Sequence, residues 1–305
     1  MSHRLRTNPL AAAIVSVLLV LLVVGVVACG SSATSTTAAP SSGTTAASTG
    51  TSAGTIATTA AGPQTLTVSA ASSLKGAFTE IGKTFDAANN CTTTFNFDAS
   101  GTLQKQIEGG APVDVFASAA KKQVKALTDA NLADPASVKV FASNEIVLIV
   151  PADSTLNITS FADLAKADVK RIAYGDPVVA PHGVAAEEIL KKLAIFDQVK
   201  PKVVYAQNVS QALTYVTSGE VDASIVFVSE AKSAGDKVKI VATSDPSWHS
   251  AIAYPICLVT ASKVKPLGQA FIDYVAGADG QAVLAKYGFL PASAATTATT
   301  TTPSS

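Results

Sequence analysis

Residues 99–118 read ASGTLQKQIEGGAPVDVFAS, and this stretch contains one complete repeat of the helix and strand pattern that decides the fold. Ser100 and Gly101 precede an expected helix, in which Leu103 and Ile107 are four residues apart and so share one face. The letters VDVFA near the end of the stretch indicate a short apolar strand. Serine at a helix start can cap the helix, and glycine allows the backbone to approach another group closely.

Strands and helices continue to alternate on both sides of this stretch. Strands are expected at 65–70, 92–97, 145–150, 170–174, 202–206, 223–228, 238–242 and 254–259. Further helices are expected from Ser73 and at 121–132, 160–167, 184–194, 209–218, 265–276 and 279–287. Apolar strands that alternate with helices indicate parallel or mixed sheets with helices on both faces. The sequence therefore predicts an α/β fold in two units, with a ligand cleft between them at the carboxyl ends of the strands.

The first 29 residues are typical of an export signal. Arg4 and Arg6 precede an uncharged, almost wholly apolar run at 11–28, and Cys29 follows at once. This pattern resembles a bacterial lipoprotein signal, in which Cys29 would be lipidated and become the new N-terminus. An uncleaved anchor is the alternative, because an apolar run of this length nearly spans a bilayer. In both cases we expect the folded part at the extracytoplasmic face of the cell membrane.

Residues 30–64 and 292–305 consist mostly of Ser, Thr, Ala and Gly. Because such stretches lack the apolar residues that offset ordering entropy, we expect a disordered tether and a disordered tail. The Ser/Thr-rich tether also permits O-glycosylation. The folded part is then expected to comprise a first lobe of 65–147 and 254–291 and a second lobe of 148–253, with a hinge near 146–151 and 252–256.

The charge balance and the absence of metal and catalytic motifs exclude several functions. The 305 residues include 22 Lys+Arg and 22 Asp+Glu, so the formal net charge is zero, which argues against a nucleic-acid binder. No G-x-S-x-G, H-E-x-x-H or paired-cysteine pattern occurs, so a hydrolytic enzyme is only a distant alternative and no metal site is expected. Cys91 and Cys257 could form a disulfide or stay free and buried, and the sequence leaves both possibilities open.

Four turns before expected helices carry small or polar residues: Ala71-Ser72-Ser73, Ala99-Ser100-Gly101, Ala180-Pro181-His182-Gly183 and Asn208-Val209. Each turn can be an ordinary helix cap, and Asn208 with Gln211 fits a capping box. If several of these helix starts converge, their free N–H groups would hold an anion.

Five segments, at 67–74, 99–118, 171–183, 208–231 and 254–259, resemble the molybdate-binding proteins of bacterial ABC importers. The resemblance extends over nearly all of the chain between its two tails. It implies a two-lobed type II periplasmic-binding-protein fold, with mixed sheets flanked by helices and an oxyanion buried between the lobes. It further implies a monomer without cofactor that delivers molybdate or tungstate to a membrane permease by closure of the lobes.

The same resemblance assigns ligand-binding residues by position. Ser73 and Ser100 would donate hydroxyl hydrogen bonds from the first lobe, with Ser72 as an auxiliary donor. His182 and Val209 would donate backbone N–H groups from the second lobe, although the family commonly has alanine at the position of His182.

Two departures from the family pattern leave the identity of the oxyanion open. Phe227 occupies the fifth ligand position, where the family usually has tyrosine; the lost donor would cost about 1–3 kcal/mol unless water, Ser229 or His182 replaces it. Asp98 could accept a proton from hydrogen phosphate and would repel molybdate or sulfate, unless it is a solvated loop carboxylate. Sulfate and phosphate are therefore alternative ligands. A carboxylate ligand is disfavoured, because Arg171 is the only arginine of the core.

Overall fold

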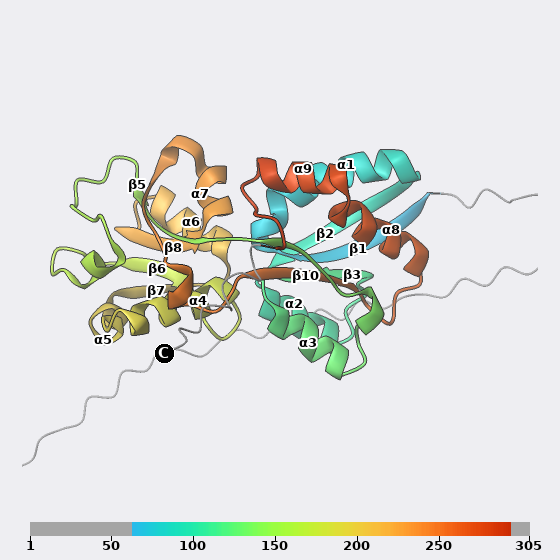
Figure 1. Cartoon of the computed structure of the whole chain (residues 1–305), viewed down its shortest axis with the longest axis horizontal. Coiled ribbons are helices and arrows are strands. Elements are labelled where there is room, and N and C mark those ends of the chain that lie inside the picture. The colour runs from blue at the N-terminus through green and yellow to red at the C-terminus, as the bar shows by residue number, and fades with distance from the viewer. Residues whose placement is uncertain (1–62, 294–305) are drawn as a thin grey trace, which may run out of the picture. The chain divides into compact units, whose positions relative to one another are not determined.

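A computed structural model describes residues 63–293 of the chain (Figure 1). The expected lipoprotein signal with Cys29, nearly all of the tether and most of the tail lie outside the described residues. Among the residues that are described, no helix has the length and apolar character needed to cross a membrane.

The first lobe contains a five-stranded mixed sheet with the strand order β2-β1-β3-β10-β4. Its strands are β1 (Gln64–Ala71), β2 (Cys91–Asp98), β3 (Val115–Ala117), β4 (Lys139–Ser143) and β10 (Ala253–Leu258). Its helices are α1 (Lys75–Asn89), α2 (Ser100–Glu108), α3 (Lys121–Asp129), α8 (Lys265–Ala276) and α9 (Ala278–Lys286). Helices α1, α8 and α9 lie on one side of the sheet and α2 and α3 on the other (Figure 1).

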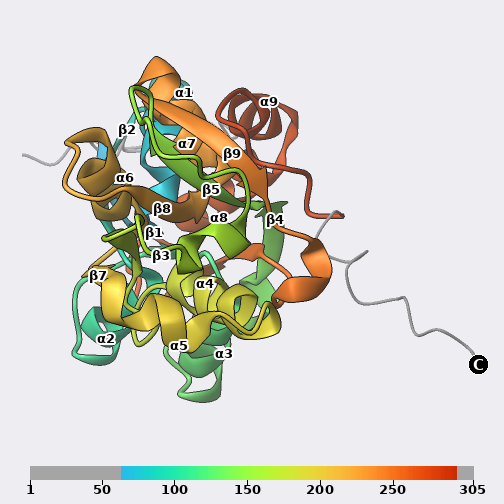
Figure 2. The ribbon, with the colours of Figure 1, turned by 90° about the vertical axis from the view of Figure 1, so that its left-hand side faces the viewer.

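The second lobe repeats this plan with the strand order β7-β6-β8-β5-β9. Its strands are β5 (Ile146–Pro151), β6 (Ile172–Gly175), β7 (Val203–Ala206), β8 (Ala223–Phe227) and β9 (Val238–Thr243). Its helices are α4 (Pro181–Lys192), α5 (Phe196–Val199), α6 (Val209–Thr217) and α7 (Val228–Ala234). Helices α4 and α5 lie on one side of this sheet and α6 and α7 on the other (Figure 2). Short 3-10 helices occupy Ser72–Leu74, Pro135–Ser137, Phe161–Ala165, Lys200–Lys202, Gly235–Lys237 and Pro246–Trp248.

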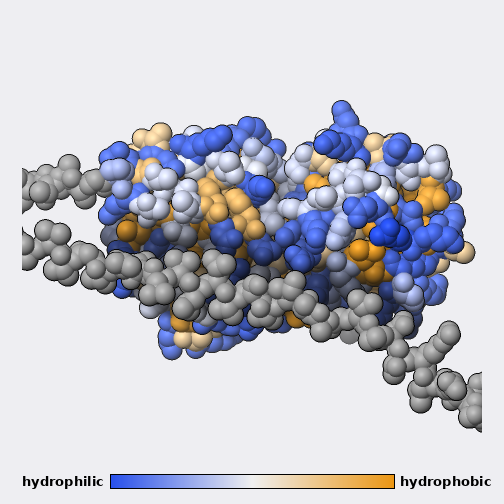
Figure 3. Space-filling model, turned by 180° about the vertical axis from the view of Figure 1, so that it is seen from behind, coloured by the Kyte–Doolittle hydropathy of each residue, from blue (hydrophilic) through white to orange (hydrophobic). Residues whose placement is uncertain are grey.

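The core of each lobe follows from the apolar pattern of its elements. In the first lobe, Phe78 and Phe85 on the buried face of α1 pack edge-on against Phe271 of α8, with ring centroids 5.7 and 5.2 Å apart. In the second lobe, β5 is a continuous apolar strand because it lies between β8 and β9 and is covered on both faces. The surface seen from behind is mostly hydrophilic, with small scattered apolar patches (Figure 3).

The chain passes from the first sheet to the second at Asn144 and Glu145, slightly earlier than the expected boundary at 147. Ile146 and Val147 pair with β8 and therefore belong to the second sheet. The hinge expected at 146–151 thus falls on a buried strand, whose ladder hydrogen bonds make it a poor pivot. The return crossing follows Thr243, the last residue of β9, and Ala253 already pairs with Ser143 in the first sheet.

Both cysteines of the described region are buried and free. Cys91 lies on β2 and Cys257 on β10, and two strands, β1 and β3, separate them in the sheet. Neighbouring strands are about 4.8 Å apart, so three strand spacings place these residues far beyond the reach of a disulfide.

Candidate anion-binding site

All the ligand-binding residues expected from the sequence line one small cavity between the lobes. They are Ser72, Ser73, Ser100, His182, Val209 and Phe227. The closed lobes leave a free volume of about 10 Å³ in this cavity, which is about the space that one water molecule needs. Among the described residues that line the cavity, none is a lysine or an arginine.

These residues converge because each lies at the junction between a strand and the helix that follows it. Ser73 follows β1 and Ser100 begins α2 directly after β2, and these two strands are parallel. In the second lobe, α4 follows β6 and α6 follows β7, again from two parallel strands. Carboxyl ends of parallel strands share one edge of a sheet, so the helix starts of both lobes meet at the cleft.

The two serine hydroxyls of the first lobe are buried, and each has a hydrogen-bond partner within the protein. Ser100 Oγ accepts the backbone N–H of Ala119 at 2.9 Å. Ser73 Oγ lies 3.0 Å from the hydroxyl of Tyr254, a residue of β10. Neither serine caps its helix with its side chain, so the alternative explanation of these turns as ordinary caps does not hold for them.

The second lobe contributes the starts of α4 and α6. Pro181 is the first residue of α4 and has no N–H, so His182 carries the first backbone donor of that helix. Asn208 caps α6 by accepting the N–H of Gln211 at 3.1 Å. The expected capping box does not close, because the side chain of Gln211 accepts the N–H of Gln207 instead of that of Asn208.

The side chain of His182 is buried, and its Nε2 atom has no hydrogen-bond partner among the described residues. The imidazole lies where a Cβ atom on Gly175 would be, and its ring centroid is 5.8 Å from that of Phe227. Burial lowers the pKa of His182 to about 3, so the ring is neutral at physiological pH. The imidazole therefore adds no positive charge to the cavity.

Phe227 is also buried and brings no polar atom to the cavity. Its ring packs edge-on against that of Tyr254, with centroids 5.8 Å apart. Of the suggested replacements for the missing hydroxyl, Ser229 is already bonded to Asn144 at 2.9 Å. Tyr254, whose hydroxyl contacts the candidate ligand residue Ser73 directly, was not predicted from the sequence. Its position in the buried strand YPICLV was the only signal in the sequence.

Asp98 is not a solvated loop carboxylate. Its Oδ1 atom accepts hydrogen bonds from the Ala99 N–H at 2.7 Å and from Asn208 Nδ2, in the opposite lobe, at 3.0 Å. A second link between the lobes joins the N–H of Gly101 to the carbonyl oxygen of Val179 at 2.9 Å. The two lobes are thus in direct contact on both sides of Ser100.

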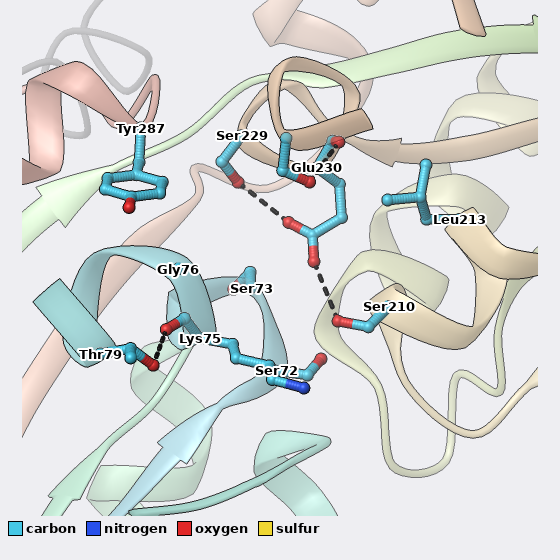
Figure 4. Close-up of a pocket in the computed structure, with 11 residues that line it drawn as sticks. Ser72, Ser73, Lys75, Gly76, Thr79, Ser210, Leu213, Ser229, Glu230 and Tyr287 are labelled. Atoms are coloured by element: carbon cyan, nitrogen blue, oxygen red, sulfur yellow. Dashed lines mark hydrogen bonds between the residues drawn. The ribbon is translucent and has the colours of Figure 1, made fainter. Parts of the chain in front are cut away.

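A second, wider pocket adjoins this cavity and shares Ser72 and Ser73 with it (Figure 4). Glu230 of α7 projects toward it and is buried, with hydroxyl donors from Ser210 at 3.2 Å and Ser229 at 3.3 Å. Burial raises the pKa of Glu230 to about 7, and the two serine hydrogen bonds oppose this increase. Within residues 63–293, no group of three or more His, Cys, Asp and Glu could hold a metal ion.

Comparison with known proteins gives this cavity its context. A family model described as bacterial extracellular solute-binding protein matches residues 66–290. YvgL of Bacillus subtilis, provisionally named an ABC transporter substrate-binding lipoprotein, is 39% identical over 227 residues, which cover 74% of this chain and 86% of YvgL. The molybdate-binding protein ModA of Haemophilus influenzae is 34% identical over 228 residues, covering 73% of this chain and 89% of ModA.

A solved structure shows the same fold. It is the substrate-binding domain of a Clostridium difficile protein that is provisionally named a molybdenum ABC transporter. It is 36% identical with a TM-score of 0.59, and the match covers 75% of this chain and 99% of that domain. The expected type II periplasmic-binding-protein fold is thereby confirmed, as is the resemblance to molybdate-binding proteins.

The relatives are solute-binding proteins, which bind and release a ligand without turning it over. The distant alternative of a hydrolytic enzyme is therefore set aside. The chain belongs to the bacterial extracellular solute-binding protein family, as a substrate-binding protein of an ABC transporter.

Proposed function

We propose that this protein captures molybdate or tungstate outside the cytoplasm and delivers it to the permease of an ABC importer. One observation carries the proposal: the Ser73 and Ser100 hydroxyls and the starts of α4 and α6 converge on a cavity lined by no lysine or arginine. Such a cavity suits an anion whose charge is met by neutral donors and helix N-termini. The names of the molybdate-binding relatives support the choice of anion.

The ligand donors are Ser73 Oγ, Ser100 Oγ and the backbone N–H groups of His182 and Val209, with Ser72 as an auxiliary donor. Phe227 forms an apolar wall at the fifth position. A tetrahedral dianion presents only acceptors, so it matches this set of donors. Hydrogen phosphate also carries a proton that needs an acceptor, and Oδ2 of Asp98 could supply one, because both hydrogen bonds to this carboxylate go to Oδ1. Phosphate is therefore the alternative ligand that the titrations below must test.

Delivery requires a closed state that the permease can distinguish from the open one. The hydrogen bonds from Asn208 to Asp98 and from Gly101 to Val179 form when the lobes close over the ligand. The ligand favours closure only by binding the closed state more tightly than the open state. The protein acts as a monomer, held at the membrane through lipidated Cys29 and the tether of residues 30–64.

Parallel calorimetric titrations of the whole mature protein with molybdate, tungstate, sulfate and phosphate test the proposal. We expect saturable binding of molybdate and tungstate, with sulfate and phosphate much weaker. The double variant Ser73→Ala, Ser100→Ala should abolish binding, whereas the exposed pair Ser218→Ala, Ser247→Ala should bind like the unmodified protein. Binding of sulfate or phosphate alone would refute the molybdate assignment, and unchanged affinity of the first double variant would refute the site.

A further inference from the structure

Asn144 occupies the first crossing between the lobes, and the hydrogen bonds of its buried side chain fix its orientation. Its Oδ1 atom accepts the backbone N–H of Glu145 at 3.0 Å. Because a backbone N–H can only donate, this bond identifies the oxygen of the amide and turns the nitrogen the other way. Asn144 Nδ2 then donates to Ser229 Oγ at 2.9 Å and, in a longer contact, to the Tyr254 hydroxyl at 3.4 Å.

The direction of the next hydrogen bond follows from the first. An amide nitrogen has no free lone pair, so Tyr254 cannot donate its proton back to Asn144. The other partner of the Tyr254 hydroxyl in the described structure is Ser73 Oγ, at 3.0 Å. Burial raises the pKa of Tyr254 well above its ordinary value, so the hydroxyl keeps its proton. Buried hydroxyl groups satisfy their donor, and Tyr254 therefore donates to Ser73.

Ser73 is left with its own proton free. Its oxygen accepts from Tyr254, and the serine lines the small cavity, so the free proton can point toward a ligand there. Ser100 has the same arrangement, because its oxygen accepts the backbone N–H of Ala119. The two serines differ in what orients the hydroxyl group. A backbone N–H orients the hydroxyl of Ser100, whereas the side chains of Tyr254 and Asn144 orient that of Ser73.

The second branch from Asn144 runs in the same direction. Ser229 accepts from Asn144 and donates to the Glu230 carboxyl group (Figure 4). Tyr254 and Ser229 therefore each accept a hydrogen bond from Asn144. Each donates its own hydroxyl hydrogen to the next group, which is Ser73 for Tyr254 and Glu230 for Ser229. Asn144 is the common starting point of the two chains of hydrogen bonds.

We propose that Asn144, acting through Tyr254, holds the Ser73 hydroxyl as a proton donor to the cavity and thereby selects fully deprotonated oxyanions. The inference rests on the proposed function, since it explains how that site would prefer molybdate to hydrogen phosphate. Asn144 and Tyr254 are positioning residues, because they act through Ser73. Tyr254 also supports the site beside Phe227, where the family's usual hydroxyl is missing.

The variant Tyr254→Phe removes the connection to Ser73 without adding charge and keeps the aromatic packing. We expect calorimetry to show molybdate bound about 10-fold more weakly, the scale of a lost hydrogen bond in a charged site. Phosphate binding should change less, so the molybdate-to-phosphate affinity ratio should fall. The matched control is Tyr274→Phe, which removes a hydroxyl bonded to Thr84 on the outer side of the first lobe. The control should retain both affinity and ratio.

The variant Asn144→Asp reverses the chain, because a carboxylate oxygen accepts from Tyr254 where the amide donated. Ser73 would then donate to Tyr254 and present lone pairs to the anion, so molybdate affinity should fall by more than in Tyr254→Phe. A double-mutant cycle separates positioning from general destabilisation. In a Ser73→Ala background, Tyr254→Phe should cause no further loss.

The outcomes distinguish this inference from the proposed function. If the unmodified protein binds molybdate and Tyr254→Phe keeps its affinity and its ratio, the positioning role is refuted and the function stands. An equal loss from Tyr254→Phe with and without Ser73 would also refute it. If the unmodified protein binds none of the four oxyanions, the proposed function fails, and this inference fails with it. Melting temperatures of all variants identify any loss that comes from unfolding, and Tyr254→Phe decides the matter if Asn144→Asp does not fold.

Discussion

Asp98 and Asn208 are joined across the cleft by a 3.0 Å hydrogen bond from Asn208 Nδ2 to Asp98 Oδ1. The other end of the same amide caps α6 by accepting the N–H of Gln211. One side chain thus connects the end of β2 in the first lobe to the helix start that carries Val209 in the second. The contact between the lobes and the position of a candidate ligand donor are therefore coupled.

The variant Asn208→Asp separates these two roles. Aspartate caps a helix as well as asparagine does, so the free energy of unfolding without ligand should change by less than about 1 kcal/mol. Its second oxygen would face Asp98, and repulsion between the carboxylates should oppose closure and weaken molybdate binding about 10-fold. Calorimetry and urea unfolding measure the two effects. The double variant Asp98→Asn, Asn208→Asp restores one donor and one acceptor and should recover most of the affinity. If the single variant retains full affinity, the contact has no part in closure.

Gly101 permits the close approach of the lobes on the other side of Ser100. A Cβ atom there would lie 2.7 Å from the carbonyl oxygen and 2.8 Å from the Cα atom of Val179. In Gly101→Ala we therefore expect molybdate affinity to fall at least about 10-fold because the lobes cannot close fully, by analogy with the cost of overpacking. The free energy of unfolding of the open, ligand-free protein should stay constant or rise by up to about 1 kcal/mol, since alanine favours a helix.

The neighbouring variant Thr102→Ala, in the same helix, is the control for the alanine substitution and should bind normally. Small-angle scattering with and without molybdate checks the mechanism. The Gly101→Ala protein should remain more open at saturating ligand than the control. Equal compaction of the two variants would contradict the steric explanation.

The position of the candidate site could be predicted from the sequence, because helix starts that follow apolar strands have recognisable residues. The Ser-Ser, Ser-Gly, Pro-His and Asn-Val turns identify the carboxyl edges of both sheets, and these turns do line one cavity. The hydrogen bond between Ser73 and Tyr254 was beyond such reasoning, since 181 positions separate the two residues and only the sheet order brings them together. Periodicity likewise says nothing about the direction of a hydroxyl proton.

Three elements of the fold were also missed for physical reasons. The edge strand β4 has a short and partly exposed pattern, with Val140 36% exposed. Helix α7 begins directly after β8 without a turn residue, so its start looks like the end of the strand. Helix α5 has only four residues, too few to show a helical period. The error at the lobe boundary arose because the apolar run from Ile146 shows no break at which one sheet ends.

Glu230 should make stability depend on pH in a definite direction. Its pKa is about 7 in the folded protein, raised by burial from an ordinary value of 4.5. The folded state thus holds a proton that the unfolded state releases, so this contribution to stability is complete below pH 4.5 and is lost as the pH rises through 7. The variant Glu230→Gln keeps the shape without the charge. The difference in unfolding free energy between Glu230→Gln and the unmodified protein should therefore depend on pH. It should favour the variant by on the order of 3 kcal/mol more at pH 8 than at pH 4.

Urea unfolding at several pH values measures this difference. Burial lowers the pKa of His182, so this residue affects the pH dependence of stability in the opposite direction. Its contribution to stability is present above pH 6.5 and is lost as the pH falls toward 3. Both proteins contain His182, so its contribution cancels when they are compared. A constant difference between the two proteins from pH 4 to pH 8 would contradict the burial of an ionisable Glu230.

The hydroxyl that the family resemblance leads one to expect at position 227 can be introduced there. The Phe227 ring lies between His182 and Tyr254 and lines the small cavity, so Phe227→Tyr places a hydroxyl close to the candidate ligand donors. A new hydrogen bond to an anion is worth about 1.5–3 kcal/mol, so molybdate affinity should rise about 10-fold or more if the hydroxyl reaches the oxyanion. Calorimetry of Phe227→Tyr measures this gain. The control is Phe196→Tyr in α5, which does not line the cavity and should leave the affinity unchanged. A fall in affinity for Phe227→Tyr would mean that the hydroxyl binds to Tyr254 or His182 instead and that this chain has a four-donor site closed by an apolar wall.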